Sequence, residues 1–229
     1  MKNLLLCMAL VLLMGQMAFA TPELFLKTGA TTATVGGVGS NVSLVLTTLG
    51  GWSISAVIGA SHSPSTSPNG IDIASLTATC SGGVCVTNPL DVWLSDIGFT
   101  ATSTNFTNNY SATITGGTGT TSESAWVGLG NVLFQSSGAD GGPTVAGGTS
   151  IGTVTLTGTG VLSNAVTGGP SAGPAPYSLT IEDVFNGTGT TTVQYSTDGA
   201  ISTVPEPASV VLLGGLVLFV SSRLRRRKV

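Results

Sequence analysis

Short stretches of alternating apolar and polar residues recur along the chain. In the stretch WSISAVI, alternation places Trp52, Ile54, Ala56 and Ile58 on one face of an extended segment. Successive side chains of a strand point to opposite faces, so this pattern is typical of a strand buried on one side. Eight further segments are rich in Val, Ile, Thr and aromatic residues and are bounded by Gly, Pro, Asn and Ser: 41–46, 75–80, 90–94, 110–115, 124–134, 152–158, 177–185 and 190–196.

The segment 177–185, YSLTIEDVF, has the same alternation over a longer run. It sends Tyr177, Leu179 and Ile181 to one face, followed by Asp183 or, after a shift, Phe185.

No interior segment keeps a helical apolar period over three turns, and about nine short strands follow one another without helices between them. This pattern predicts an all-β fold with a single antiparallel β-sandwich, jelly-roll or immunoglobulin-like in topology. The tracts SHSPSTSPNG and SSGADGGPTVAGGTS are predicted to be exposed loops within one domain. The segments TGGTGTT, TGTG and GTGTTT share a composition but do not form a repeat.

The charges are few and unevenly placed. Of the 229 residues only 7% are charged, which argues against an ordinary cytosolic enzyme. Between Thr21 and Val204, Lys27 is the only base against nine acids, a net charge of −8. A surface of this sign repels phosphate backbones, so we expect no nucleic-acid partner.

The N-terminal 20 residues have the layout of a secretory signal peptide. Lys2 precedes an apolar stretch, and Ala18 and Ala20 supply the small residues of a cleavage site after Ala20. The alternative is a permanent N-terminal anchor, but Gln16 and the cleavage site leave the apolar run short for a membrane span. The prediction is export through the secretion translocon.

The C-terminal residues combine an apolar run with a basic end. The run from Ala208 to Ser222 would form a helix of about 22 Å, against a hydrocarbon core of about 30 Å. It can cross only if the bilayer thins or the arginines snorkel. The positive-inside rule keeps the basic cluster in the cytoplasm and everything before it outside. This membrane-stop cluster comprises Arg223, Arg225, Arg226, Arg227 and Lys228.

Just before this run stand Pro205, Glu206 and Pro207, which keep the backbone extended and outside the helix. The order of Pro-Glu-Pro, apolar run and basic end resembles the PEP-CTERM sorting signal of Gram-negative bacteria. The resemblance covers about the last 25 residues. It implies recognition and removal by an exosortase-type membrane enzyme, and a mature protein associated with extracellular polymer or biofilm material. A plain C-terminal anchor is the alternative.

The expected organisation has three parts. Residues 1–20 form the signal peptide, residues 21–203 the β-sandwich extracellular domain, and residues 204–229 the sorting segment with its short transmembrane helix. The precursor is expected to be anchored in the membrane, and the mature form to lie at the cell surface or outside the cell.

The sequence CSGGVC places Cys80 and Cys85 around a Gly-Gly turn. In an exported chain this spacing predicts a local disulfide. A metal centre would need more Cys or His ligands, and the only histidine is His62. We therefore expect neither a metal nor a cofactor.

Aromatic residues raise the alternative of a carbohydrate-binding or adhesin module. The stretch LDVWLSDIGF offers Trp93 or Phe99 as a platform on which a sugar ring stacks, against the interpretation that these rings belong to the core. The binding hypothesis predicts that at least one of the three tryptophans, Trp52, Trp93 and Trp126, is exposed beside Asp or Asn in a groove.

Two further motifs are weak. Residues 148–152, GTSIG, match the nucleophile elbow G-x-S-x-G at Ser150, but the flanking strand-turn-helix pattern is missing. A secreted hydrolase would also need His62 buried against a carboxylate. In IEDVFNGTG, the oxygens of Glu182, Asp183 and Asn186 lack the spacing of a calcium loop, which favours an exposed strand end. The sequence therefore favours an exported non-catalytic protein.

Overall fold

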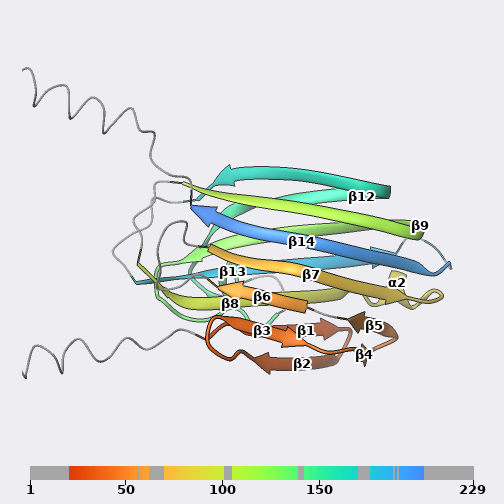
Figure 1. The fold of residues 1–229 in the computed structure, drawn as a ribbon, viewed down its shortest axis with the longest axis horizontal. Helices are drawn as coiled ribbons and strands as arrows, with labels where there is room; N and C mark the ends of the chain where they lie inside the picture. Colours follow the sequence, from red (N-terminus) through yellow and green to blue (C-terminus); the bar gives the residue numbers. More distant parts are fainter. Residues whose placement is uncertain are drawn as a thin grey trace, which may run out of the picture.

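The computed structural model describes residues 21–203 except 56, 62–69, 101–104, 139–141, 170–175, 188 and 190, and it leaves the side chains of 57, 58, 84 and 85 undescribed. These residues form strands packed in two layers (Figure 1). The β13 layer contains β1 (Glu23–Thr28), β2 (Thr31–Gly36), β8 (Leu90–Phe99) and β13 (Tyr177–Gly187). The β14 layer contains β3 (Asn41–Leu44), β4 (Thr47–Leu49), β5 (Trp52–Ser55), β6 (Val57–Ser61), β7 (Gly70–Cys80) and β14 (Val193–Thr203).

Two long strands, β9 (Phe106–Gly128) and β12 (Gly148–Gly168), belong to both layers. The order β2-β1-β8-β13-β9-β14-β7-β5-β4 is antiparallel throughout, with β12 beside β9, and β6 beside both β7 and β3. A separate parallel pair is made by β10 (Gln135–Ser136) and β11 (Val145–Ala146), and α2 (Val84–Thr87) is a single turn. The prediction of an all-β, antiparallel sandwich is confirmed for the described residues.

Strand β9 passes from one layer to the other because it bends at a glycine cluster. Residues 106–115 pair with β14, whereas residues 119–128 pair with β13. Gly116 lies at the bend with φ of 81°, and a Cβ there would come within 2.5 Å of the Thr192 carbonyl oxygen. β12 bends in step with β9 at a bulge between Gly158 and Gly160. The segments TGGTGTT and TGTG of the sequence are therefore corners of the fold.

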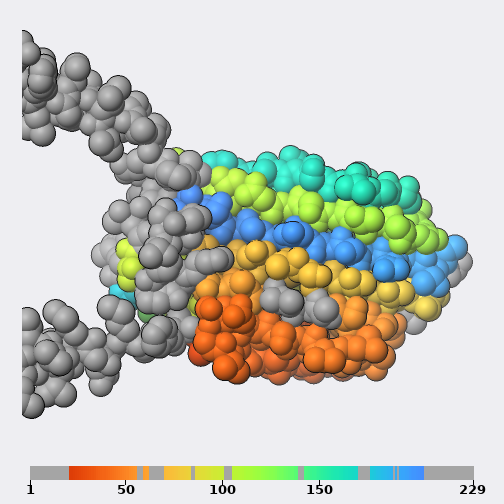
Figure 2. All heavy atoms as spheres, in the orientation of Figure 1, coloured from red at the N-terminus to blue at the C-terminus, as the bar shows by residue number. Residues whose placement is uncertain are grey.

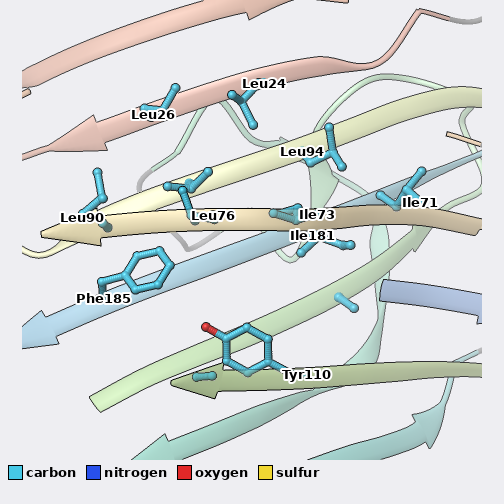
Figure 3. Close-up of a cluster of buried hydrophobic side chains, with 14 of the residues drawn as sticks. Leu24, Leu26, Ile71, Ile73, Leu76, Leu90, Leu94, Tyr110, Ile181 and Phe185 are labelled. Carbon is cyan, nitrogen blue, oxygen red and sulfur yellow. The ribbon is translucent and has the colours of Figure 1, made fainter. Parts of the chain in front are cut away.

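The core lies between the layers and is built by alternation along each strand. Figure 3 shows side chains from β1, β7, β8, β9 and β13 meeting there. Trp52 is fully buried, its ring 6.4 Å from that of Phe185 and 6.0 Å from that of Tyr195. Its indole Nε1 donates a hydrogen bond to the Asn88 carbonyl oxygen at 2.9 Å. The ring contacts of Trp52 thus connect β5 with β13 and β14.

Several strand predictions were wrong in their limits. The stretch 52–58 is not one strand, because β5 ends at Ser55 and β6 begins at Val57. The predicted strand 110–115 and the first part of the predicted strand 124–134 both belong to the single strand β9, which ends at Gly128, so residues 129–134 lie outside it. Strands β1 and β2 and the half of β12 after Gly158 were not predicted. The predicted loop 136–150 contains β11 and the start of β12.

The start of the first described strand, β1, and the end of the last one, β14, lie at the same end of the sandwich. Glu23 begins β1 opposite Ser95 in the second half of β8, and Thr203 ends β14 opposite Phe106 at the start of β9. Phe106 contacts Tyr177, which pairs with Phe99 at that same end of β8. In Figure 1, β1 therefore starts and β14 finishes on the left.

In the part of the chain that the structure describes, no helix is long and apolar enough to cross a membrane. The signal peptide and the sorting segment fall on residues 1–20 and 204–229, outside the described residues. The short transmembrane helix therefore stays a prediction.

Candidate functional site

A groove crosses the outer face of β12, β9 and β14, the strands that lie side by side in the upper half of Figure 2. It has a volume of about 430 Å³. A second hollow of about 230 Å³ shares Ser111 and Asp198 with it and extends toward Ala74 and Ser75 of β7. The main groove is lined by Asn109, Tyr110, Ser111, Ser163, Asn164, Ala165, Asp198 and Ala200.

Strand alternation creates this groove. On β9, Asn109 and Ser111 face outward while Tyr110 between them is buried. Ser111 lies opposite Ser163 on one side and Asp198 on the other. Short side chains on the flanking strands leave room above the sheet, so amide, hydroxyl and carboxyl groups line an open depression.

The chemistry of the groove is that of hydrogen bonding. Asn109 offers both a donor and an acceptor, Ser111 and Ser163 offer hydroxyls, and Asp198 contributes one negative charge. Within the described residues, no group of three or more His, Cys, Asp or Glu side chains could hold a metal ion. The groove is therefore suited to a hydroxyl-rich ligand without phosphate or carboxylate groups.

Behind the groove floor lie two carboxyl groups that the sequence did not single out as a pair. Glu123 of β9 and Asp183 of β13 are directly opposite each other, and both are completely buried between the layers. Thr197 of β14 donates a hydrogen bond to Asp183 Oδ2 at 3.4 Å. Gly199 faces Glu123 so closely that a Cβ on it would lie 1.5 Å from Glu123 Oε2. The absence of a side chain at Gly199 makes space for this pair.

The pair holds protons in the folded protein. Burial, followed by the charge of Asp183 and the hydrogen bond with it, raises the pKa of Glu123 well above its usual value. Burial raises the pKa of Asp183 to about 7, although hydrogen bonds with Glu123 and Thr197 lower it. The negative charges of Asp198 and Asp72 act on Glu123 in the same direction as burial. A protonated carboxyl can donate the hydrogen bond that two carboxylates cannot share.

Asp183 is therefore not at the exposed strand end that the sequence predicted. Asp183 and Phe185 both face the interior, because they lie on the same side of β13 and no shift separates them. Glu182 belongs to the opposite face, across from Trp93. Neighbouring residues of a strand point apart, so Glu182 and Asp183 do not converge on one cation.

Trp93 and Phe99 are both fully buried, which corrects the hypothesis that either is an open stacking platform. Trp93 stacks on Trp126 at 5.7 Å between centroids, and Phe99 stacks on Tyr177 at 5.7 Å. Other protein groups cover these rings, which leaves no free face for a sugar.

The three tryptophans all lie inside the protein. Trp52 and Trp93 have no exposed surface, and Trp126 is 5% exposed. Trp93 and Trp126 form a small second core with Phe134, on the outer face of the β13 layer. The prediction of an exposed tryptophan in a groove is therefore wrong, and a ligand in the groove described above would bind without tryptophan stacking.

The disulfide stays a prediction. Cys80 ends β7 and is fully buried, and Cys85 lies in α2 with its side chain outside the described set. The backbone between them turns at Gly82, which has φ of 72°. A turn of this kind is what the predicted bridge requires.

Ser150 lies in the extended strand β12, opposite Trp126. A nucleophile elbow instead places its serine at a sharp turn between a strand and a helix. His62 falls outside the described residues, as do the sorting residues Pro205, Glu206 and Pro207, the basic cluster and the cleavage residues Ala18 and Ala20.

No protein-family model and no curated protein matches the chain. Several solved structures resemble its fold distantly. TmCBM61 in complex with beta-1,4-galactotriose has a TM-score of 0.30 at 9% identity, over 56% of this chain and 71% of that one. A CBM4 structure has a TM-score of 0.30 at 13% identity, over 78% of each chain.

The N-terminal cellulose-binding domain of a Cellulomonas fimi beta-1,4-glucanase has a TM-score of 0.31 at 14% identity, over 58% of this chain and 81% of that one. Scores this low do not identify a ligand. The fold defines the class of this protein as an antiparallel β-sandwich, and its function has to be argued from its own residues.

Proposed function

We propose that the protein is an exported, non-catalytic cell-surface or extracellular-matrix protein that is sorted and processed through residues 204–229. The observation that carries this proposal is that β1 begins and β14 ends at the same end of the sandwich. A domain held by its C-terminal segment would place this end next to the membrane. The groove on the side of the sandwich would stay open to the surroundings.

The proposed handle consists of three physical parts. The basic cluster stays in the cytoplasm, the apolar run lies in the bilayer, and Pro205, Glu206 and Pro207 present an extended peptide at the outer surface. Backbone that is outside a helix is accessible to a membrane protease of the exosortase type. Glu206 is the only charge in this peptide and is the proposed recognition group. Cleavage there removes the anchor together with the five basic residues.

Expression of the full chain in hosts with and without an exosortase tests this proposal. We expect mass spectrometry to find a C-terminus close to Pro205 only when the enzyme is present, and Glu206→Gln to reduce that product. Ser202→Ala, just before the motif, is the matched control and should be processed normally. If the surface form ends in an intact RRRKV in both hosts, the segment is an ordinary anchor.

The groove favours a second candidate function, carbohydrate binding. Its polar groups match sugar hydroxyls, and its volume of about 430 Å³ falls in the usual range for ligand sites. Because Asp198 and the net negative charge repel anions, the ligand we propose is a neutral polysaccharide. An extracellular polymer of this kind would fit a matrix protein.

Affinity electrophoresis in gels containing neutral glucans, galactans or a uronic-acid polymer tests this second function. We expect a neutral polymer to retard the protein, and Asn109→Ala to weaken that retardation because it removes hydrogen bonds to the sugar. Thr34→Ala, on the exposed side of β2, is the matched control. Equal retardation of both variants, or retardation by the uronic-acid polymer alone, contradicts binding in the groove.

A further inference from the structure

Strand β12 is an edge strand along its whole length. Among the described residues it pairs with β9 alone, from Gly148 to Gly168 with two bulges. Hydroxyl pairs such as Ser124 with Thr153, at 2.9 Å, join the two strands on the outer face. The other side of the β12 backbone faces away from β9 in both layers. Peptide groups on such an edge can pair with another strand.

This edge lacks the usual features that prevent pairing. Natural edge strands are protected by charged residues, especially lysine, or by proline. β12 contains neither, and no charged residue occurs between positions 141 and 181. Residues 106–122 of the neighbouring β9 are also uncharged. A body with nine acids and one lysine repels a second copy over most of its surface, but not at this edge.

The second half of β12 is the more accessible part. In the first half Val154 and Leu156 are buried, and Gly148 lies against the backbone of β10. In the second half Val161 is 82% exposed, and residues 163–165 are exposed on both faces of the strand. The glycine bulge at 158–160 separates the halves, so a straight partner strand can follow only one of them.

The sequence VLSNAVT of this second half is complementary to itself. In an antiparallel pair centred on Asn164, Leu162 of one copy lies opposite Val166 of the other, and the two Asn164 amides face each other. Leu162 and Val166 are only partly covered in the single chain. Side chains that are directly opposite in neighbouring strands are close enough to cover one another.

We propose that β12 pairs antiparallel with β12 of a second copy of this chain, centred on Asn164, to form a symmetric dimer. The two β14 layers then join into one continuous sheet. The two-fold axis of such a pair stands perpendicular to the sheet, so both grooves lie on the same side of the dimer. The inference does not depend on the ligand of the groove.

Sedimentation velocity across a dilution series of the protein, expressed as the full chain and purified after export, tests the dimer. We expect a reversible monomer–dimer equilibrium, and Asn164→Lys to weaken association by about tenfold or more because it places like charges opposite each other. Thr34→Lys adds the same charge to the edge strand β2 and should leave association unchanged. Circular dichroism should show that both variants keep the native fold.

A second measurement tests the register. Asn164→Cys should form a disulfide between copies under mild oxidation, because opposite residues of an antiparallel pair lie within bridging distance. Thr155→Cys, in the first half of β12, should not cross-link. A wild-type protein that stays monomeric at every concentration overturns the proposal. A dimer that Thr34→Lys disrupts and Asn164→Lys leaves intact overturns it as well.

Discussion

The free energy of unfolding should fall as the pH rises from about 5 to about 8, because Glu123 and Asp183 keep protons in the folded protein that the unfolded chain releases. An exposed carboxyl titrates near pH 4. Between that value and the raised folded pKa values, the folded state binds more protons than the unfolded state. A rise in pH therefore favours unfolding. Below about pH 4 both states are protonated, so the pair no longer makes the stability depend on pH.

The expected slope is about 1.4 kcal/mol per pH unit for each proton retained. For Asp183 it extends up to its folded pKa of about 7, and Glu123 contributes in the same direction because burial raises its pKa well above its usual value. Two further acids act on the pair, Asp72 of β7 and Asp198 of β14. Their negative charges raise the pKa of Glu123 further. The only lysine of the body, Lys27, belongs to β1. No lysine or arginine on β7, β9, β13 or β14 therefore compensates the negative charge when both carboxyls ionise.

Tyr110, which packs toward the pair from β9, stays neutral throughout this range. Its hydroxyl is hydrogen-bonded to that of Thr121, and burial and the charge of Asp183 raise its pKa well above its usual value. Asp91 adds a smaller pH dependence of its own, since burial raises its pKa to about 6 despite the charge of Lys27. The pair is therefore best isolated by comparing variants above about pH 6.

Urea unfolding of wild type and Glu123→Gln at several pH values makes this comparison. The amide has nearly the same shape and cannot ionise, so we expect the variant to match wild type near pH 5 and to exceed it near pH 8. Glu23→Gln on β1 removes one charge elsewhere and should keep the wild-type slope. A wild-type stability that does not change over this range, or an unchanged slope in Glu123→Gln, would contradict the prediction.

Trp52→Ala should destabilise the protein by about 3–5 kcal/mol, the usual cost of removing a buried tryptophan. The side chain is fully buried among Phe185 and Tyr195, and its loss leaves a cavity between the two layers. It also removes the indole donor from the half-buried carbonyl of Asn88, which then keeps only the longer hydrogen bond from the Thr28 hydroxyl. A loss of this size is a large part of the total stability of a single domain.

Trp52→Phe is the matched control for the cavity. It keeps an aromatic ring in the core and removes the hydrogen bond, so we expect it to cost clearly less than the alanine variant. The midpoint of urea unfolding at pH 5, where the acid pair is protonated, is the appropriate measurement. A cost of less than about 1 kcal/mol for Trp52→Ala would mean that this tryptophan does not join the layers.

The glycine-rich segments are places where the sequence pattern predicted the strand limits incorrectly. Alternation identified residues 110–115 and 124–128 of β9, but the apparent end of the strand at Gly116 is a corner within it. Glycines at 158 and 160 had the same effect on β12, where the chain continues as strand to Gly168. Glycine signals a change of direction, and neighbouring strands decide whether that change is a turn or a bend.

The candidate site was harder to predict than the fold. Asp183 was recognised at the end of an inward row, but its partner Glu123 is 60 positions away in the sequence. Only the pairing of β13 with β9 brings the two carboxyls together. The groove depends on three strands in the same way, since its polar residues come from β9, β12 and β14 and lie far apart in the sequence. From the sequence, Trp93 could belong to the core or be exposed on the surface. Its burial is explained only by the second core on the outer face of the β13 layer.

By itself, the sequence determined the all-β class, because alternation and turn residues act over a few neighbouring positions and both were present along the chain. It also determined the charge of the body and the layout of the two ends on which the sorting proposal depends. The tertiary structure decided which tryptophans are covered, where the acid pair lies, and that β12 is an edge. These features arise from contacts between residues distant in sequence, and the order of the strands fixes those contacts.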